Sequence, residues 1–353
     1  MFSSFGIKFS TFLLHLSIVM VPFSFSNNTS NDTKEEIDNE LLIKQEKKDL
    51  LAGNYKAICY SGYRTGQHPD RGEGAKNPSD NEILEDLDII TNSGFQLIRL
   101  YDSGSNTESV LRIIKEYKLN IKVMLGIWLR AEISNHQGCS WLIEPIPDEI
   151  LEQNKVLNYN EIQDGIRLAN SYSNIVVAVN VGNEALVSWN DHMVSKDSVI
   201  SYVTRVKKEI QQPVSVADNY EWWATEGHDV AKVVDFISVH IYPVWEGKDI
   251  DEGMPYSIEN IQKVRNSLPN SKIVIGEAGW ASVASEFGER ANEHKQKQYF
   301  DDLMQWSRDM NITTFFFEAF DENWKGDPNN PMGAEKHWGL YTINRKPKLV
   351  MKK

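Results

Sequence analysis

Short β-rich runs alternate with stretches of helical period from residue 55 to the end of the chain, and this alternation limits the possible folds most. Most of the runs are almost continuously apolar, which is typical of strands covered on both faces. Helical patterns lie between them, for example at 81–94 and 107–120, where Gly94 and Asn120 are expected to end the helices. The β-rich runs occupy residues 55–63, 95–102, 121–128, 175–184, 213–220, 234–243, 272–280 and 312–322.

Eight strand–helix units in roughly 300 residues predict an α/β protein with a single (β/α)8 TIM barrel. We expect the barrel domain to cover residues 51–353. An open, doubly wound sheet is the alternative, because eight parallel strands need not close.

A barrel of this kind carries its site at the carboxyl ends of the strands. Polar, acidic and aromatic residues gather at those ends, whereas the strand beginnings are plain apolar residues, and a packed core does not require that asymmetry. The pattern therefore predicts a cleft that binds a ligand. The residues at the ends are Ser61, Gly62, Tyr63, Arg64, Arg99, Tyr101, Asp102, Trp128, Arg130, Asn183, Glu184, Asp218, Asn219, Tyr220, His240, Tyr242, Glu277, Trp280, Glu318, Asp321 and Glu322.

Glu184 and Glu277 end the fourth and seventh runs, which lie on opposite sides of an eight-stranded barrel. Two facing carboxylates are the minimal apparatus for glycoside hydrolysis, at about 5–5.5 Å in the retaining case. Taken alone, either glutamate could equally be solvated or paired with an arginine. Asn183 and Glu184 point to opposite sides of an ideal strand, so both reach the cleft only if the backbone turns there.

Six motifs together resemble those of glycoside hydrolase family 17, the β-1,3-glucanases often called laminarinases. The resemblance covers essentially the whole chain after residue 55. It implies a retaining, double-displacement mechanism on a (β/α)8 barrel. The motifs are RLYD (99–102), VGNEAL (181–186), HIYP (240–243), IGEAGW (275–280), FEAFDENWKG (317–326) and EKHWGLY (335–341).

The resemblance also implies roles for the residues that match the family's motifs. Glu184 corresponds to the general acid/base and Glu277 to the nucleophile, and Asn183 to the amide that holds the sugar 2-hydroxyl. An acid–Lys–acid set formed by Glu322, Lys325 and Glu335 is expected to border the acid/base and tune it. A surface salt bridge is the alternative for Lys325.

Aromatic residues at strand ends are candidates for sugar binding, namely Tyr101, Tyr242 and Trp280. Trp280 could instead pack beneath the nucleophile, since it follows Glu277 by three positions. His240 is a further candidate, either bonded near the nucleophile or held as a structural histidine.

The resemblance implies an endo-β-1,3-glucanase acting on laminarin-like polysaccharide or oligosaccharide. A β-1,3-glucan transglycosylase and an exo-acting enzyme remain alternatives, because the stretches 64–80 and 141–149 depart from the plant members of the family and loops shape the ends of a cleft. A non-catalytic glucan-binding protein is a third possibility, although such a protein would be expected to lose a carboxylate.

The first residues fit an export signal. Lys8 precedes an apolar stretch and small residues follow, so we expect a signal peptide at 1–26, a polar linker at 27–50, and a secreted, periplasmic or cell-surface protein. A retained membrane anchor is the alternative.

Composition excludes several partners. A net charge of -13 argues against nucleic acid and against a membrane surface once the signal is removed. The usual metal and nucleotide motifs are missing, so neither a metal nor an organic cofactor is expected. Cys59 and Cys139 are expected to be two separate buried thiols, and the protein is expected to be a monomer.

Overall fold

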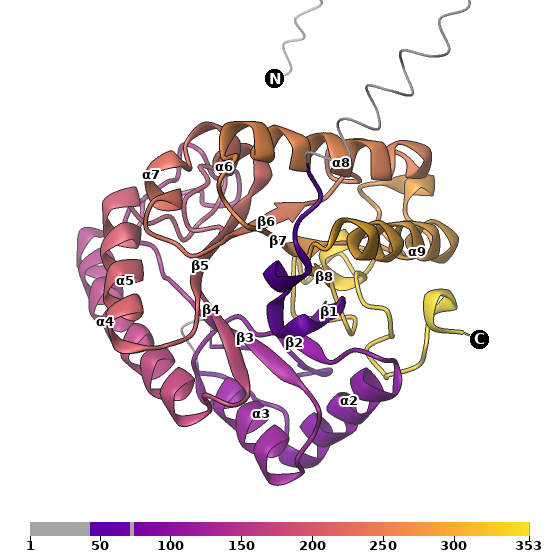
Figure 1. Ribbon diagram of the computed structural model, residues 1–353, viewed down its shortest axis with the longest axis horizontal. Helices are drawn as coiled ribbons and strands as arrows, with labels where there is room; N and C mark the ends of the chain where they lie inside the picture. The colour runs from indigo at the N-terminus through magenta and orange to yellow at the C-terminus, as the bar shows by residue number, and fades with distance from the viewer. Residues whose placement is uncertain (1–42, 71–73, 353) are drawn as a thin grey trace, which may run out of the picture. The chain divides into compact units, whose positions relative to one another are not determined.

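Eight parallel strands form a closed barrel in the computed structural model, which describes residues 43–70 and 74–352. Each strand pairs with its neighbour in chain order, and the last pairs with the first through Lys56 with Thr314 and Ile58 with Phe316. The helices lie around the outside of the strands (Figure 1). This closure confirms the predicted (β/α)8 barrel and excludes the open sheet.

The elements follow the predicted alternation. The strands are β1 (Lys56–Cys59), β2 (Leu97–Arg99), β3 (Lys122–Ile127), β4 (Val176–Asn183), β5 (Val214–Asn219), β6 (Ile237–Ile241), β7 (Ile273–Ala278) and β8 (Thr314–Phe316). The helices are α2 (Asp80–Asn92), α3 (Ser105–Glu116), α4 (Asp148–Ser171), α5 (Lys196–Glu209), α6 (Tyr220–Thr225), α7 (His228–Ala231), α8 (Ile250–Ser267) and α9 (Glu293–Met310). The short 3-10 turns are η1 (Lys47–Asp49), η2 (Leu51–Gly53), η3 (Gly288–Arg290), η4 (Ala334–Lys336) and η5 (Leu349–Met351).

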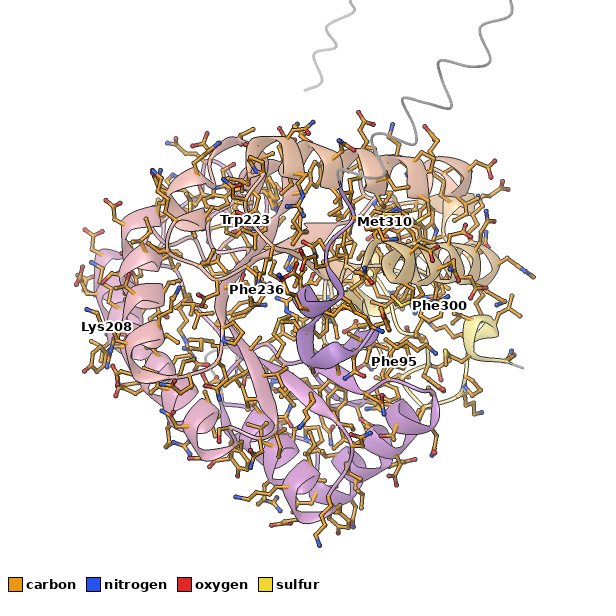
Figure 2. All side chains as sticks on the ribbon, in the orientation of Figure 1. Phe95, Lys208, Trp223, Phe236, Phe300 and Met310 are labelled. Atoms are coloured by element: carbon orange, nitrogen blue, oxygen red, sulfur yellow. The ribbon has the colours of Figure 1, made fainter. Side chains whose placement is uncertain are left out.

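Aromatic side chains fill part of the space between the strands and the outer helices. Phe300 of α9 packs edge-on against Phe316 of β8, with 4.9 Å between the ring centroids, and lies 6.4 Å from Phe95 before β2 (Figure 2). Burying a side chain of this size contributes roughly 1.5–3 kcal/mol. The outer face of the strands is therefore covered by apolar contacts, as their continuous apolar sequences predict.

The helix ends agree with the sequence in one case and differ in another. Gly94 follows α2 with a φ of +83°, as predicted for a glycine that ends a helix. Asn120, in contrast, does not end α3, because this helix stops at Glu116 and Lys118 takes the left-handed conformation with a φ of +53°. The prediction for Asn120 was wrong because a lysine, not the expected residue, supplies the turn.

The polar segment before the barrel is partly built into it. Ile43 and Leu50 are buried, and the side-chain amide of Gln45 donates to the carbonyl of Ile273 (2.9 Å) and accepts from its N–H (2.7 Å). The predicted linker at 27–50 is therefore too long at its C-terminal end, since residues 43–50 cap the start of β7. The predicted signal peptide and the rest of that linker lie outside the described residues.

The cysteines are separate and buried, as predicted. The Cys59 thiol lies 3.4 Å from the carbonyl oxygen of Gly276 in the barrel interior. Within 43–70 and 74–352, no helix is both long and apolar enough to cross a membrane.

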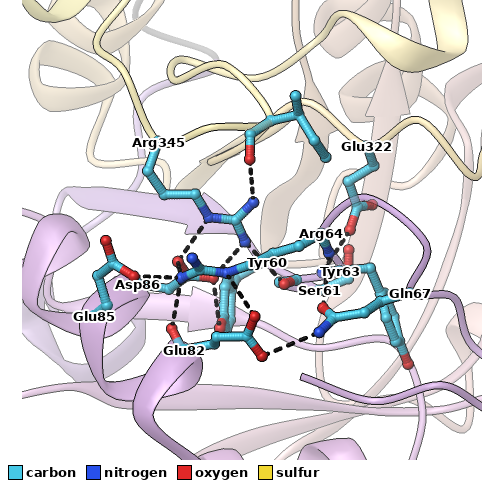
Figure 3. Close-up of polar contacts among 12 residues, drawn as sticks. Tyr60, Ser61, Tyr63, Arg64, Gln67, Glu82, Glu85, Asp86, Glu322 and Arg345 are labelled. Carbon is cyan, nitrogen blue, oxygen red and sulfur yellow. Dashed lines mark hydrogen bonds and ion pairs between the residues drawn. The ribbon is translucent and has the colours of Figure 1, made fainter. Parts of the chain in front are cut away.

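The end of the chain is tied to α2 by a buried ion pair (Figure 3). Arg345 contacts both carboxylate oxygens of Asp86, with Nε 2.8 Å from Oδ1 and Nη2 2.6 Å from Oδ2. Nη2 of Arg64 approaches the same carboxylate at 2.8 Å, and Arg345 also donates to the carbonyl of Gly62. Burial raises the pKa of Asp86, although the two guanidinium groups oppose that shift. The ion pair joins the C-terminal segment to α2, and the hydrogen bond to Gly62 joins it to the loop after β1.

Replacing Arg345 with alanine should lower the free energy of unfolding by about 3 kcal/mol, because a fully buried carboxylate would lose its main partner. Arg112→Ala is the matched control, since its pair with Asp80 is exposed and such pairs contribute about 0–1 kcal/mol. Denaturant unfolding of both variants checks this expectation. Equal losses would show that the Arg345 pair contributes no more than a surface pair.

Candidate active site

The two predicted carboxylates lie side by side at the carboxyl end of the barrel. Glu277 belongs to β7 and Glu184 follows directly after β4. Nδ1 of His240, on β6, lies 2.9 Å from Oε1 of Glu184 and 3.5 Å from Oε2 of Glu277. The Glu184 side chain is 23% exposed and that of Glu277 is 7% exposed, so Glu184 is the more open to solvent.

The backbone turns where β4 ends. Because of this turn, the side chains of both Asn183 and Glu184 reach the site. Gly182 has a φ of +85° and Glu184 a φ of +50°, and the register with β5 shifts between Asn180 and Asn183. A left-handed conformation costs a non-glycine residue roughly 1–2 kcal/mol, so contacts in the folded protein must hold it. The turn brings Oδ1 of Asn183 to 2.5 Å from Nη2 of Arg99, on the same side as Glu184.

Arg99 of β2 is the buried centre of the site; the sequence analysis placed it among the strand-end residues but gave it no role. Its Nη1 donates to Oε1 of Glu277 (2.7 Å) and to Nε2 of His240 (3.0 Å), while Nη2 donates to Asn183. A guanidinium has no acceptor, so Nε2 of His240 accepts, and Nδ1 carries the hydrogen that points at Glu184. An arginine inside an apolar strand was the available signal, because a buried charge needs partners.

Glu277 is held in its ionised form. Burial alone would raise its pKa, but the electropositive edge of His240, the charge of Arg99 and the hydroxyl of Tyr242 outweigh burial and lower the pKa. The Tyr242 hydroxyl donates to Oε2 of Glu277 at 2.5 Å. A carboxylate kept ionised suits a nucleophile.

Tyr242→Phe should move the acid limb of the pH profile of kcat/KM toward higher pH. Loss of the hydroxyl removes a hydrogen bond to the ionised form of Glu277, so its pKa rises and more of it is protonated at a given pH. We also expect about a tenfold fall in kcat/KM at neutral pH. Tyr299→Phe, which removes a buried hydroxyl bonded to Ser257, is the control. An unchanged acid limb in Tyr242→Phe would contradict the prediction.

Lys325 joins two buried carboxylates near the site: Glu322, which belongs to the predicted set, and Glu318, which takes the place expected for Glu335. Its Nζ lies 2.7 Å from Oε2 of Glu318 and 2.9 Å from Oε2 of Glu322, and the N–H of Tyr63 donates to the other oxygen of Glu322. Glu318 was therefore missed as a partner of Lys325. The surface salt bridge is excluded, because all three side chains are at most 14% exposed.

Glu335 lies beside this ion-pair cluster without an ion pair to Lys325 within 4.0 Å. It packs near Gly326, where an added Cβ would lie 3.1 Å from the Cβ of Glu335. Burial raises the pKa of Glu335, Lys325 opposes that shift, and the negative charges of Glu184 and Glu277 add to it. Glu335 therefore lies within electrostatic range of Glu184 and Glu277.

Two of the predicted sugar-binding residues are fully buried. Trp280 packs against Tyr299 and donates its indole N–H to the carbonyl of Arg290, so it lies beneath the site as in the alternative considered above. His240 is also buried and contacts the carboxylates from below, which excludes an open sugar-binding surface at that position. Tyr101 is half-buried, with its ring 4.8 Å from the guanidinium carbon of Arg99.

Exposed tryptophans occur on loops at this end of the barrel and were not predicted as site residues. Trp141 follows β3, Trp189 follows β4 and Trp245 follows β6, and each side chain is at least 42% exposed. A tryptophan within a polar loop was the signal that could have found them. Within the described residues, no group of three or more His, Cys, Asp or Glu side chains is arranged to hold a metal ion.

The sequence model of the BtgE/BtgC glycoside hydrolase domain matches residues 57–339, from the second residue of β1 to beyond β8. The chain belongs to this family. Among curated members, a glucan 1,3-beta-glucosidase of Schizosaccharomyces pombe is 28% identical over 75% of this chain and 78% of its own length. A btgC protein of Aspergillus niger, named as a glucan endo-1,3-beta-glucosidase, is 27% identical over 76% of this chain. The chain spans only 39% of that longer relative.

Two solved structures of enzymes with related names have the same fold. An endo-laminarinase from Formosa Hel1_33_131 is 27% identical and superposes with a TM-score of 0.72, over 87% of this chain and 88% of its own. A glycoside hydrolase family 17 β-1,3-glucanosyltransferase from Rhizomucor miehei is 20% identical, with a TM-score of 0.64 over 87% of this chain and 98% of its own. The solved structures confirm the fold, and the family match together with the curated relatives confirms the predicted resemblance to the β-1,3-glucanases.

Proposed function

We propose that the protein is a retaining endo-β-1,3-glucanase that cleaves laminarin-like glucan. The proposal rests on one observation: the same imidazole nitrogen, Nδ1 of His240, lies close to the carboxylates of both Glu184 and Glu277. Because Nδ1 of His240 lies 2.9 and 3.5 Å from the two carboxylates, their nearest oxygens cannot be farther apart than the sum of these distances. This upper limit admits the ~5–5.5 Å separation of retaining enzymes, and a retaining mechanism is also what the family resemblance implies.

Glu277 acts as the nucleophile in this proposal. One of its oxygens attacks the anomeric carbon and forms a glycosyl ester, while the bond from that carbon to the glycosidic oxygen breaks. Glu184 gives its proton to the departing oxygen. A water molecule then attacks the anomeric carbon, Glu184 takes the proton of that water, and the bond to Glu277 breaks. Both carboxylates end in the forms in which they began.

The surroundings of the two carboxylates suit Glu277 to the role of nucleophile and Glu184 to that of acid/base. Glu277 is the more buried and is kept ionised by Arg99 and Tyr242, which suits attack on carbon. Glu184 is more open and accepts one hydrogen bond from His240, so it can exchange protons with the leaving group and with water. Different surroundings for two nearby carboxylates are the usual basis of such a division.

We assign sugar contacts to the groups that lie beside the carboxylates. Arg99 holds the amide oxygen of Asn183, which leaves the amide nitrogen as the donor for the sugar 2-hydroxyl. Tyr242 and the half-buried Tyr101 are the remaining aromatic candidates for contact with the reacting sugar. Neither a metal nor an organic cofactor takes part in these steps.

The choice of a β-1,3-glucan as the substrate rests on the family members named above. Products from laminarin, resolved by length over time, test the proposal. Early release of oligosaccharides of several lengths supports internal cleavage, whereas glucose or one short product from the first minutes would indicate exo action. Products longer than a supplied oligosaccharide would show transfer to sugar in place of water. Binding of laminarin without new reducing ends would indicate a non-catalytic protein.

Export is a separate part of the proposal, because it rests on the N-terminal sequence and not on the site. We propose that residues 1–26 are removed as a signal peptide, so that the enzyme is secreted, periplasmic or at the cell surface. N-terminal sequencing of the exported protein tests this, and a first residue near position 27 is expected. Retention of residues 1–26 on the exported protein would contradict cleavage and indicate an anchor.

A further inference from the structure

We propose that Asn190 and His192 are positioning residues that hold the acid/base glutamate in its left-handed turn. The proposal rests on the assignment of Glu184 as the acid/base. Both residues lie in the loop between β4 and α5, six and eight positions after Glu184.

Side chains of this loop fix the two peptide groups that flank the Cα atom of Glu184. On one side, Nε2 of His192 lies 2.8 Å from the carbonyl oxygen of Asn183, and the N–H of Glu184 donates to the carbonyl of Ala217 on β5 at 2.8 Å. On the other side, Nδ2 of Asn190 donates to the carbonyl oxygen of Glu184 at 3.2 Å. With both peptide planes held, the direction of the Cα–Cβ bond of Glu184 is fixed.

The His192 ring is itself held in place. A carbonyl oxygen only accepts, so Nε2 of His192 carries the hydrogen that it donates to Asn183. Nδ1 lies 3.0 Å from Oδ1 of Asp191, and the ring packs on Trp128 at the end of β3, with 4.4 Å between centroids. The ring therefore cannot rotate without losing contacts on both edges and on one face.

The loop that carries these residues is closed on the barrel. The N–H of Val194 donates to the carbonyl of Ala185 at 2.8 Å, and the side chain of Asn135, from the loop after β3, donates to the carbonyl of Asn190 at 3.3 Å. Two loops and strand β5 thus hold one residue whose backbone conformation is unfavourable for a glutamate. Residues around a site commonly hold catalytic groups in this way, and a small displacement of a proton donor lowers the rate.

A loss of positioning should appear where proton donation limits the rate. Laminaritetraose has a sugar leaving group that must be protonated, whereas the dinitrophenolate of 2,4-dinitrophenyl β-laminaribioside leaves without a proton. His192→Phe keeps the ring on Trp128 and removes the donor to Asn183. We expect it to lower kcat/KM for laminaritetraose about tenfold and to change kcat/KM for the aryl substrate by less than about threefold.

His192→Gln is the matched variant, because its amide can still donate to the carbonyl of Asn183, and it should recover most of the lost activity. Asn190→Leu removes the second donor and should show the same dependence on the leaving group. The ratio of the two kcat/KM values does not depend on the fraction of folded protein. Equal losses on both substrates, or no loss on either, would overturn the proposal. Glu184→Gln is the reference, since absence of leaving-group dependence in that variant would overturn the role of Glu184 itself.

Discussion

Glu277→Gln should lower kcat for laminarin hydrolysis by on the order of 10⁴-fold or more. A neutral amide cannot form the glycosyl ester and offers no negative charge to the cationic transition state. The fold should persist, because Arg99 keeps the carbonyl of Gly276 and Oδ1 of Asn183 as acceptors. Initial rates of reducing-end release, with circular dichroism as a check on folding, measure the effect.

The control for this variant is Glu149→Gln, which makes the same change on the exposed first turn of α4 and should leave activity unaltered. Replacing Glu277 with the smaller alanine also tests the side from which the nucleophile attacks. In Glu277→Ala, azide should enter the space left by the carboxylate and attack an activated aryl substrate from that side, giving an α-glycosyl azide. Substantial hydrolysis by Glu277→Gln, or a β-glycosyl azide from Glu277→Ala, would contradict the role of nucleophile.

Glu184→Gln should lower kcat/KM for laminarin by about 10²–10⁴-fold, the usual contribution of a positioned proton donor. For 2,4-dinitrophenyl β-laminaribioside the same variant should keep kcat/KM close to that of the unaltered protein, because this leaving group departs unprotonated. The second step would still be slow, since the amide cannot take a proton from water, so the glycosyl-enzyme should accumulate. Rapid release of dinitrophenolate followed by a slow steady rate measures both effects.

With an alanine at position 184, azide should give the opposite anomer to the one expected from Glu277→Ala. Glu184→Ala should yield a β-glycosyl azide, because azide attacks the glycosyl-enzyme from the face where water normally enters. Equal losses on the aryl and natural substrates would show that Glu184 does not act as the proton donor. An α product would show that the two carboxylates have been assigned the wrong way round.

The barrel was predictable from the sequence because its strands are buried on both faces and therefore read as continuous apolar runs. The two carboxylates were predictable because each ends such a run, where burial of a charge in a packed core would be unfavourable. Burial of the Trp280 side chain was left open, because a tryptophan at a strand end has the same local sequence whether it faces the cleft or lies below it.

Other parts of the site depend on contacts between distant segments. The turn at Glu184 is held by Ala217, Asn190 and His192, and no local preference of a glutamate predicts a φ of +50°. Lys325 pairs with Glu318, seven positions before it, whereas the family resemblance implied Glu335 as the second acid. Tertiary contacts, which sequence periodicity does not encode, decide such pairings.

The anomeric form of the first product distinguishes a double displacement at Glu277 and Glu184 from a single displacement by water. Proton NMR of laminaritetraose hydrolysis, recorded before the new reducing ends equilibrate, separates the two anomers. Two successive displacements retain configuration, so we expect the β-anomer first and the α-anomer later, by mutarotation. An α-anomer formed first would show a single displacement and would exclude a glycosyl ester at Glu277.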